Sequence, residues 1–165
     1  MVKLIICALF IAIQVVLSRF LSINLQNLKI GFSFIPVMFA AYLFGPAGGV
    51  VVATISDLIG AIAFPSGAFF PGFTVTAALS GLIYGLAFHK NCSTWKIVAG
   101  VVFNEFFCSG ILNTLWLSIM YSTDFKVLIA VRVWQAVALS VVQIVFAEAF
   151  FNRLKVAKRL KDMVG

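Results

Sequence analysis

Charged residues are scarce in this sequence: Asp, Glu, Lys and Arg make up 10% of its 165 residues, and only five are acidic. A soluble domain of this length needs a polar and charged shell to remain dispersed in water. Instead, 63% of the residues are hydrophobic, 18 are Phe, and the mean hydropathy is +1.14. This composition excludes an ordinary soluble protein and predicts a single integral membrane domain over residues 1–165, in contact with the lipid bilayer.

Residues that carry catalysis are equally scarce. The sequence has no Gly-x-x-x-x-Gly-Lys-Ser/Thr phosphate loop, no His-Glu-x-x-His and no Gly-x-Ser-x-Gly. Its only histidine, His89, lies at a predicted helix end, and its three cysteines have neither metal-ligand nor disulfide spacing. We therefore expect no enzymatic activity, no metal and no cofactor in this chain. An intramembrane enzyme would have to use Asp57 with Glu105, the one candidate pair.

The apolar runs predict about six membrane-spanning helices, because each crossing needs roughly 20 apolar residues and the loops between the runs are short. The predicted spans cover residues 4–21, 32–44, 47–64, 73–88, 95–121 and 127–151. Gly45-Pro46 is a strong break between the second and third spans. The expected fold is therefore an all-α membrane protein with six transmembrane helices.

The distribution of Lys and Arg predicts the orientation, because cytoplasmic loops of membrane proteins are enriched in these residues. With six spans both termini share one side, and that side holds Lys3, Lys90, Lys96, Arg153, Lys155, Lys158, Arg159 and Lys161. The other side holds only Arg19, Lys29, Lys126 and Arg132. We therefore expect both termini in the cytoplasm. The net charge of +7 then marks an anchor facing anionic headgroups and requires no nucleic-acid partner.

Asp57 is a candidate ligand contact, because a charge inside a membrane span usually faces a cavity or a partner. It lies about ten residues into the third span, or roughly 15 Å deep at 1.5 Å per residue. Its neighbours at helical spacing are all small, including Ala53 and Gly60, so a ligand or a second helix can approach closely. A structural ion pair or a helix cap is the alternative interpretation.

The fifth span carries a polar stripe of Glu105, Ser109, Asn113 and Trp116, which share one face of an ideal helix. Such a stripe inside lipid lines either a cavity or a helix interface. For Glu105 and Ser109 the interface is a serious alternative. For Asn113 and Trp116 we favour the cavity.

Arg132 and Gln135 add a second polar face near the outer end of the sixth span, and Gln143 lies deeper on the same face. Arg132 lies roughly 9 Å below the surface, within reach of snorkelling to the headgroups. Arg19, at the outer end of the first span, reaches at best the mouth of a pocket. Lys29, in the polar segment 22–29, is either an attractor for anions or plain solvated surface.

Together these residues predict an outward-facing pocket with mid-depth carboxylates, aromatic walls and a basic rim. The Phe-rich segment 65–72 is a candidate lid. Phe69 within it and Phe73 just after it are candidates for aromatic contact with the ligand. Such a pocket suits a flat ligand with amide donors and an anionic tail. On the first helix, Ala8 and Ala12 form an Ala-x-x-x-Ala pair, which suits close helix packing, either internal or with an external partner.

Several segments follow one another in a characteristic order: KIGFSFIP at 29–36, FGP at 44–46, DLIG at 57–60, FP at 64–65, FPGFT at 70–74 and LNTLWLS at 112–118. This order and spacing resemble the substrate-binding (S) components of energy-coupling-factor (ECF) vitamin transporters. The last three segments look most like the folate-specific branch. The resemblance covers nearly the whole chain, from about Arg19 to Arg132.

The resemblance implies an S-component fold in the bacterial cell membrane, with a high-affinity site near the extracellular side for folate or a related pterin. It also implies gates formed by the loops after helices one and three. A transmembrane coupling protein and two ATPase subunits would be the partners, so that ATP is used outside this chain. The Ala8 and Ala12 pair would then contact the coupling protein. The alternatives are an S component for another vitamin, such as pantothenate, and a self-contained channel or facilitator.

Overall fold

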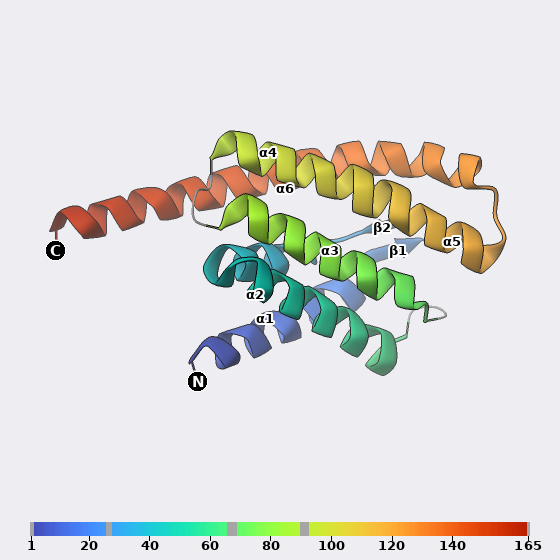
Figure 1. Ribbon diagram of the computed structural model, residues 1–165, viewed down its shortest axis with the longest axis horizontal. Coiled ribbons are helices and arrows are strands. Elements are labelled where there is room, and N and C mark those ends of the chain that lie inside the picture. The colour runs from blue at the N-terminus through green and yellow to red at the C-terminus, as the bar shows by residue number, and fades with distance from the viewer. Residues whose placement is uncertain (1, 26–27, 66–68, 90–92, 165) are drawn as a thin grey trace.

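The computed structural model describes residues 2–25, 28–65, 69–89 and 93–164, which form a bundle of long helices with one short hairpin (Figure 1). The elements are α1 (Val2–Arg19), β1 (Ile23–Leu25), β2 (Leu28–Ile30), α2 (Phe34–Ala63), α3 (Pro71–Phe88), α4 (Thr94–Phe103), η1 (Asn104–Leu112), α5 (Asn113–Tyr121) and α6 (Phe125–Val164). Both chain ends lie toward the same end of the bundle, where α6 extends well beyond the other helices.

Four helical stretches in the described part of the chain are long and apolar enough to cross a membrane: Phe34–Ala63, Pro71–Phe88, Thr94–Tyr121 and Phe125–Phe151. Large apolar side chains also cover the outside of the bundle, for example Leu4, Trp95 and Trp134, each more than three-quarters exposed. Exposed apolar surface on this scale is stable in lipid and not in water. The fold is therefore that of a helical membrane protein, as the composition predicted.

The predicted break at Gly45-Pro46 appears as an interruption within α2. Gly45 has φ 73° and ψ −162°, a backbone conformation that glycine adopts without strain. The ring of His89 lies 3.2 Å from the position that a side-chain carbon on Gly45 would occupy. The element labelled α2 therefore contains two helical segments, 34–44 and 46–63, that run in different directions.

The second segment of α2 packs closely against α3 because glycines face each other. A side-chain carbon on Gly81 would collide with the carbonyl group of Gly49 on the opposite helix. Small residues at such crossings let helices in lipid approach through van der Waals contact. This close pair forms one wall of the bundle.

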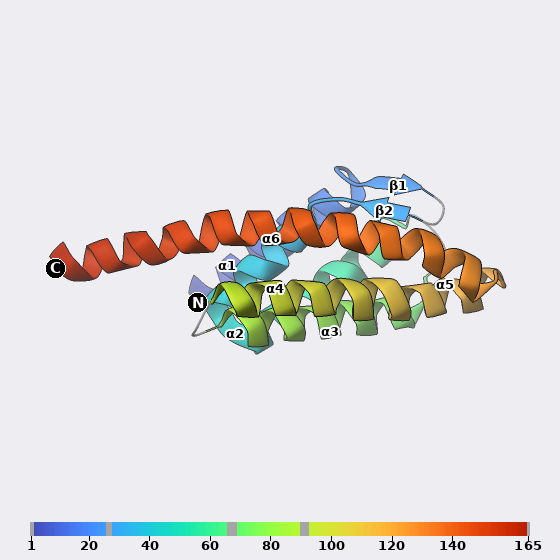
Figure 2. The same cartoon turned by 90° about the horizontal axis from the view of Figure 1, so that it is seen from above.

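The polar segment after the first helix contains a short antiparallel hairpin, which the hydropathy pattern did not predict. Ile23 pairs with Ile30 and Asn24 pairs with Lys29. Apolar and polar residues alternate along both short strands, which is the period of a strand with two different faces. Figure 2 shows the hairpin lying beside α6.

An apolar core fills the half of the bundle nearer the chain termini. Met38, Phe88, Ile97, Val101 and Phe151 are fully buried there and belong to four different helices. The rings of Phe88 and Phe151 have centroids 5.5 Å apart. The opposite half is less tightly filled, and the polar side chains gather there.

The fifth predicted span, 95–121, corresponds to the continuous helical stretch Thr94–Tyr121, but its middle is not an α-helix. Residues Asn104–Leu112 form a π-helix, η1, whose hydrogen bonds run from residue i to i+5. A π-turn holds one more residue than an α-turn, so it changes which side chains face inward. Segments of this kind occur frequently at functional sites.

Candidate functional site

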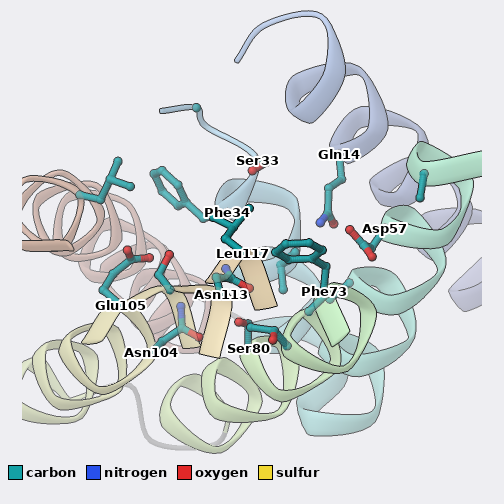
Figure 3. Close-up of a pocket in the computed structure, with 18 of the residues that line it drawn as sticks. Gln14, Ser33, Phe34, Asp57, Phe73, Ser80, Asn104, Glu105, Asn113 and Leu117 are labelled. Atoms are coloured by element: carbon teal, nitrogen blue, oxygen red, sulfur yellow. The ribbon is translucent and has the colours of Figure 1, made fainter. Parts of the chain in front are cut away.

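A cavity of about 420 Å³ lies in the half of the bundle away from the chain termini. Its wall includes side chains from α1, both segments of α2, α3, η1, α5 and α6. Figure 3 shows Asp57 and Gln14 at one side of this cavity, with Glu105 and Asn104 at the other. Phe34, Phe73, Asn113 and Leu117 lie between the two polar groups.

Asp57 projects from the second segment of α2 into the cavity, beside the start of α3. Its Oδ2 accepts a hydrogen bond of 2.8 Å from the Thr74 hydroxyl group. Gln14 of α1 lines the same side, and its Oε1 is buried with no hydrogen-bond partner among the described residues. Arg19 also lines the cavity, and its guanidinium group lies against Gly60 on α2. This side thus combines a carboxylate, an amide and a cation.

A chain of hydrogen bonds joins four side chains at the other side. Asn104 Nδ2 donates to the Tyr84 hydroxyl group at 2.7 Å, and that hydroxyl group donates to Gln143 Oε1 at 2.7 Å. Gln143 Nε2 in turn donates to Glu105 Oε1 at 2.8 Å. All four side chains are buried and line the cavity. The chain therefore links α3, η1 and α6 across the cavity wall.

Asn113, Arg132 and Gln135 also belong to the polar lining. Arg132 Nη1 donates to the carbonyl oxygen of Ser109 at 3.3 Å. Arg132 Nε and Asn113 Oδ1 are buried without a hydrogen-bond partner in the part of the chain that the structure describes. Buried polar groups are almost always hydrogen-bonded in folded proteins, so atoms left over around a cavity point to a polar ligand.

Aromatic side chains supply the apolar part of the wall. Phe69 and Phe73, both selected from the sequence, line the cavity together with Phe34 and Phe70. Phe69 is half exposed, at the edge of the segment that was expected to form a lid. Residues 66–68 of that segment lie outside the described residues. Flat rings on a cavity wall favour a planar ligand that can stack on them.

Trp116 and Lys29 are the two selected residues that the structure does not place on the cavity wall. Trp116 lies behind the wall: its Nε1 donates to Thr76 Oγ1 at 3.0 Å, and its ring centroid is 5.5 Å from that of Phe70. The π-helix explains this position, because the additional residue in its turns rotates Leu117 inward instead. Lys29 lies in β2, and its side chain is outside the described part of the structure.

Several lining residues were not selected from the sequence, notably Gln14, Thr76, Ser80 and Asn104. Gln14 was detectable, because it is a polar residue within the first apolar run. Asn104 was not, because on an ideal α-helix it points about 100° away from Glu105. Ala8 and Ala12 lie on the exposed surface of α1, outside the cavity.

Comparison with known proteins gives consistent matches over most of the chain. A model of the family described as the substrate-specific component of ECF transporters matches residues 2–155. The folate transporter FolT of Clostridium novyi is 38% identical over 126 residues, which cover 76% of this chain and 73% of the relative. FolT of Leuconostoc mesenteroides is 37% identical over 123 residues, covering 73% of this chain and 66% of that protein.

A solved structure has a similar fold. The crystal structure of FolT bound with folic acid matches with a TM-score of 0.86 and 29% sequence identity. The match covers 91% of this chain and 92% of the other.

Proposed function

This chain belongs to the family of substrate-specific components of ECF transporters, and from that premise we propose that it binds folate in the cavity and serves in its uptake. The observation that carries the proposal is the match in fold, over 91% of the chain, to FolT bound with folic acid. The two FolT relatives, more than a third identical, support the same substrate. The chain is accordingly a transport protein of the cell membrane and not an enzyme.

The chemistry of the cavity suits folate, which combines a flat pterin ring, an aromatic linker and a glutamate tail. In the proposed site Asp57, Asn113 and Gln135 form hydrogen bonds with the polar edges of the ligand. Arg19 and Arg132 bind its carboxylates, because guanidinium groups pair strongly with carboxylates. Phe69 and Phe73 stack on the planar parts. Trp116 supports this wall through Phe70, and Lys29 attracts the anionic ligand to the entrance.

We propose that the chain crosses the membrane six times with both termini in the cytoplasm. The six crossings are α1, the two segments of α2, α3, the stretch Thr94–Tyr121 and the first part of α6. Two observations support this topology: the break at Gly45, and the excess of Lys and Arg near the end of the bundle that holds both termini. The cavity then opens toward the outside.

Transport requires partners, which the family supplies in the form of an ECF module. We propose that this module consists of a transmembrane coupling protein and two ATPase subunits, so that ATP is used outside this chain. The exposed pair Ala8 and Ala12 on α1 is the proposed contact with the coupling protein. A surface of small residues lets another helix approach closely in lipid.

A self-contained channel is the alternative of a different class, and the apolar core argues against it. Met38, Phe88 and Phe151 fill the half of the bundle near the termini with fully buried apolar side chains. A polar solute would have to displace this core in order to cross. An S component for another vitamin, such as pantothenate, has the same fold and is distinguished by ligand identity.

The test is to purify the chain in mild detergent, identify any retained small molecule by mass spectrometry, and measure equilibrium binding of radiolabelled folic acid. We expect a pterin in the mass spectrum and saturable binding of folic acid at one site per chain. Pantothenate serves as the competitor that should not displace the label. Absence of folic acid binding, or displacement by pantothenate alone, would contradict the proposal.

A further inference from the structure

The hydrogen bonds at the far side of the cavity all run in one direction. Starting from Asn104, each side chain donates to the next: Asn104 to Tyr84, Tyr84 to Gln143, and Gln143 to Glu105. The links are 2.7, 2.7 and 2.8 Å long, and no member is more than 4% exposed. Water therefore has little access through which to break or reverse this relay.

Glu105 lies at the accepting end of the relay, because its Oε1 accepts from Gln143 Nε2 and a carboxyl oxygen that carries no hydrogen cannot donate. The amide group of Gln143 must consequently turn its Nε2 toward Glu105, which leaves Oε1 facing Tyr84. The Tyr84 hydroxyl hydrogen then points to Gln143, so the Tyr84 oxygen can only accept from Asn104. Each step follows from the one before, and all of them originate in a single acidic side chain.

The consequence reaches the cavity at the other end of the relay. Because one Nδ2 hydrogen is donated to Tyr84, the amide of Asn104 is fixed with Oδ1 on its other side, and Oδ1 is a buried acceptor that has no partner among the described residues. A buried acceptor without a partner is costly and is satisfied only by a donor. Asn104 lines the cavity, so the donor comes from what occupies the cavity, which is water before binding and the ligand afterwards.

We propose that Glu105 is a positioning residue for ligand selection: acting through Gln143 and Tyr84, it orients Asn104 as an acceptor for a ring N–H of the ligand. This inference rests on the proposed function and adds to it the edge of the pterin that the site reads. The 2-amino-4-oxo pterin ring of folic acid has an N–H at ring position 3. The 2,4-diamino analogue of folic acid has a bare acceptor nitrogen at that position. The relay thus favours folic acid over the diamino analogue.

The test compares the binding of folic acid and of its 2,4-diamino analogue to the full-length chain in detergent. We expect the unmodified protein to favour folic acid about tenfold or more, the effect of one mismatched buried hydrogen bond. In Glu105→Gln the new amide can donate, so the relay can reverse and turn Asn104 Nδ2 toward the ligand. The ratio of the two affinities should then fall about tenfold.

A second substitution provides a rescue that a purely structural role does not predict. In the double variant Glu105→Gln/Gln143→Glu the carboxylate moves one position along the relay, where it accepts from the new amide at position 105 and from Tyr84. The direction from Asn104 to Tyr84 is restored, and the affinity ratio should return to within about threefold of its original value. Tyr84→Phe interrupts the relay and should lower the affinity ratio as Glu105→Gln does. If Glu105→Gln fails to fold, Tyr84→Phe takes its place in the test.

Ser140→Ala is the matched control, because Ser140 is buried on α6 near Gln143 but is neither in the relay nor on the cavity wall. It should change neither affinity. An unchanged ratio in Glu105→Gln or Tyr84→Phe, with folic acid still bound, would overturn the relay and leave the proposed function intact. A double variant that keeps the lowered ratio would also overturn it. Failure of the unmodified chain to bind folic acid would contradict both.

Discussion

At the scale of single residues, the polar groups of this protein are concentrated around one cavity. Polar atoms buried in a membrane protein are costly unless a hydrogen-bond partner satisfies them. Among the described residues, four buried atoms that have no hydrogen-bond partner belong to side chains that line the cavity: Gln14 Oε1, Asn104 Oδ1, Asn113 Oδ1 and Arg132 Nε. Donors and acceptors are both represented, which fits a ligand that offers both.

Asp57→Asn tests the proposed role of the carboxylate near α3. Asp57 Oδ2 is occupied by Thr74, so the other oxygen is the one that we expect to accept from the ligand. Replacement by Asn removes the charge and substitutes a donor for one acceptor. A hydrogen bond to a charged group contributes about 1.5–3 kcal/mol, so the affinity for folic acid should fall roughly ten- to hundredfold.

Equilibrium binding of radiolabelled folic acid measures this change, and Thr74→Val is the matched control. That control removes the hydroxyl group that orients Asp57 but keeps the carboxylate, so its effect should be about threefold. If Asp57→Asn binds folic acid as tightly as the unmodified chain, Asp57 has no part in the site.

At the scale of elements, Trp116 joins α5 to α3 behind the cavity wall. Its indole N–H donates to Thr76 on α3, and its ring contacts Phe70, which precedes α3. Gly72 leaves room for this arrangement, since a side-chain carbon there would lie 2.6 Å from the Trp116 ring. We therefore expect Trp116 to hold Phe70 in place on the cavity wall.

Trp116→Phe should accelerate ligand release with little effect on association. The substitution keeps an aromatic ring but removes the bond to Thr76, and a neutral hydrogen bond contributes about 0.5–1.5 kcal/mol. The dissociation rate of folic acid should rise about three- to tenfold, measured by dilution of bound radiolabel. Trp134→Phe on the exposed face of α6 should leave the rate unchanged. Equal dissociation rates in both variants would show that Trp116 does not support this part of the cavity wall.

The elements also show where reasoning from periodicity reaches its limit. The predicted span 95–121 and the break at Gly45-Pro46 agree with the helical stretch Thr94–Tyr121 and the interruption in α2, since both follow from apolar runs and breaker residues. The π-helix η1 was not predictable, because its sequence is compatible with an α-helix. η1 packs against α3 and α6, and its wider turn goes together with the inward positions of Asn104 and Leu117, both of which line the cavity.

At the scale of the whole molecule, the two halves of the bundle have different chemistry. An apolar core fills the half near the termini, and a polar cavity occupies the other half. In the described residues, an apolar core thus lies between the cavity and the end of the bundle that holds the termini. We propose that transport depends on surfaces that contact other proteins, among them the exposed face of α1.

Ala8→Trp should separate binding from transport. Ala8 is exposed on α1, outside the set of residues that line the cavity, so folic acid binding should remain close to that of the unmodified chain. A large side chain at a small-residue contact prevents close helix approach, and uptake by vesicles that contain the complete transporter should fall at least about tenfold. Val141→Trp, on the exposed face of α6, is the matched control and should support normal uptake. Normal uptake with Ala8→Trp would remove α1 from the docking surface.

The sequence alone determined the membrane environment, the positions of the helical segments and most of the candidate side chains, because these follow from hydropathy, breaker residues and the cost of polar groups in lipid. Asp57, Asn113, Arg132 and Gln135 were all selected in this way, and all four line the cavity. Tertiary structure decided the rest. The displacement of Trp116 behind the wall and the relay from Asn104 to Glu105 depend on helix phase and on contacts between distant segments, and local sequence patterns encode neither.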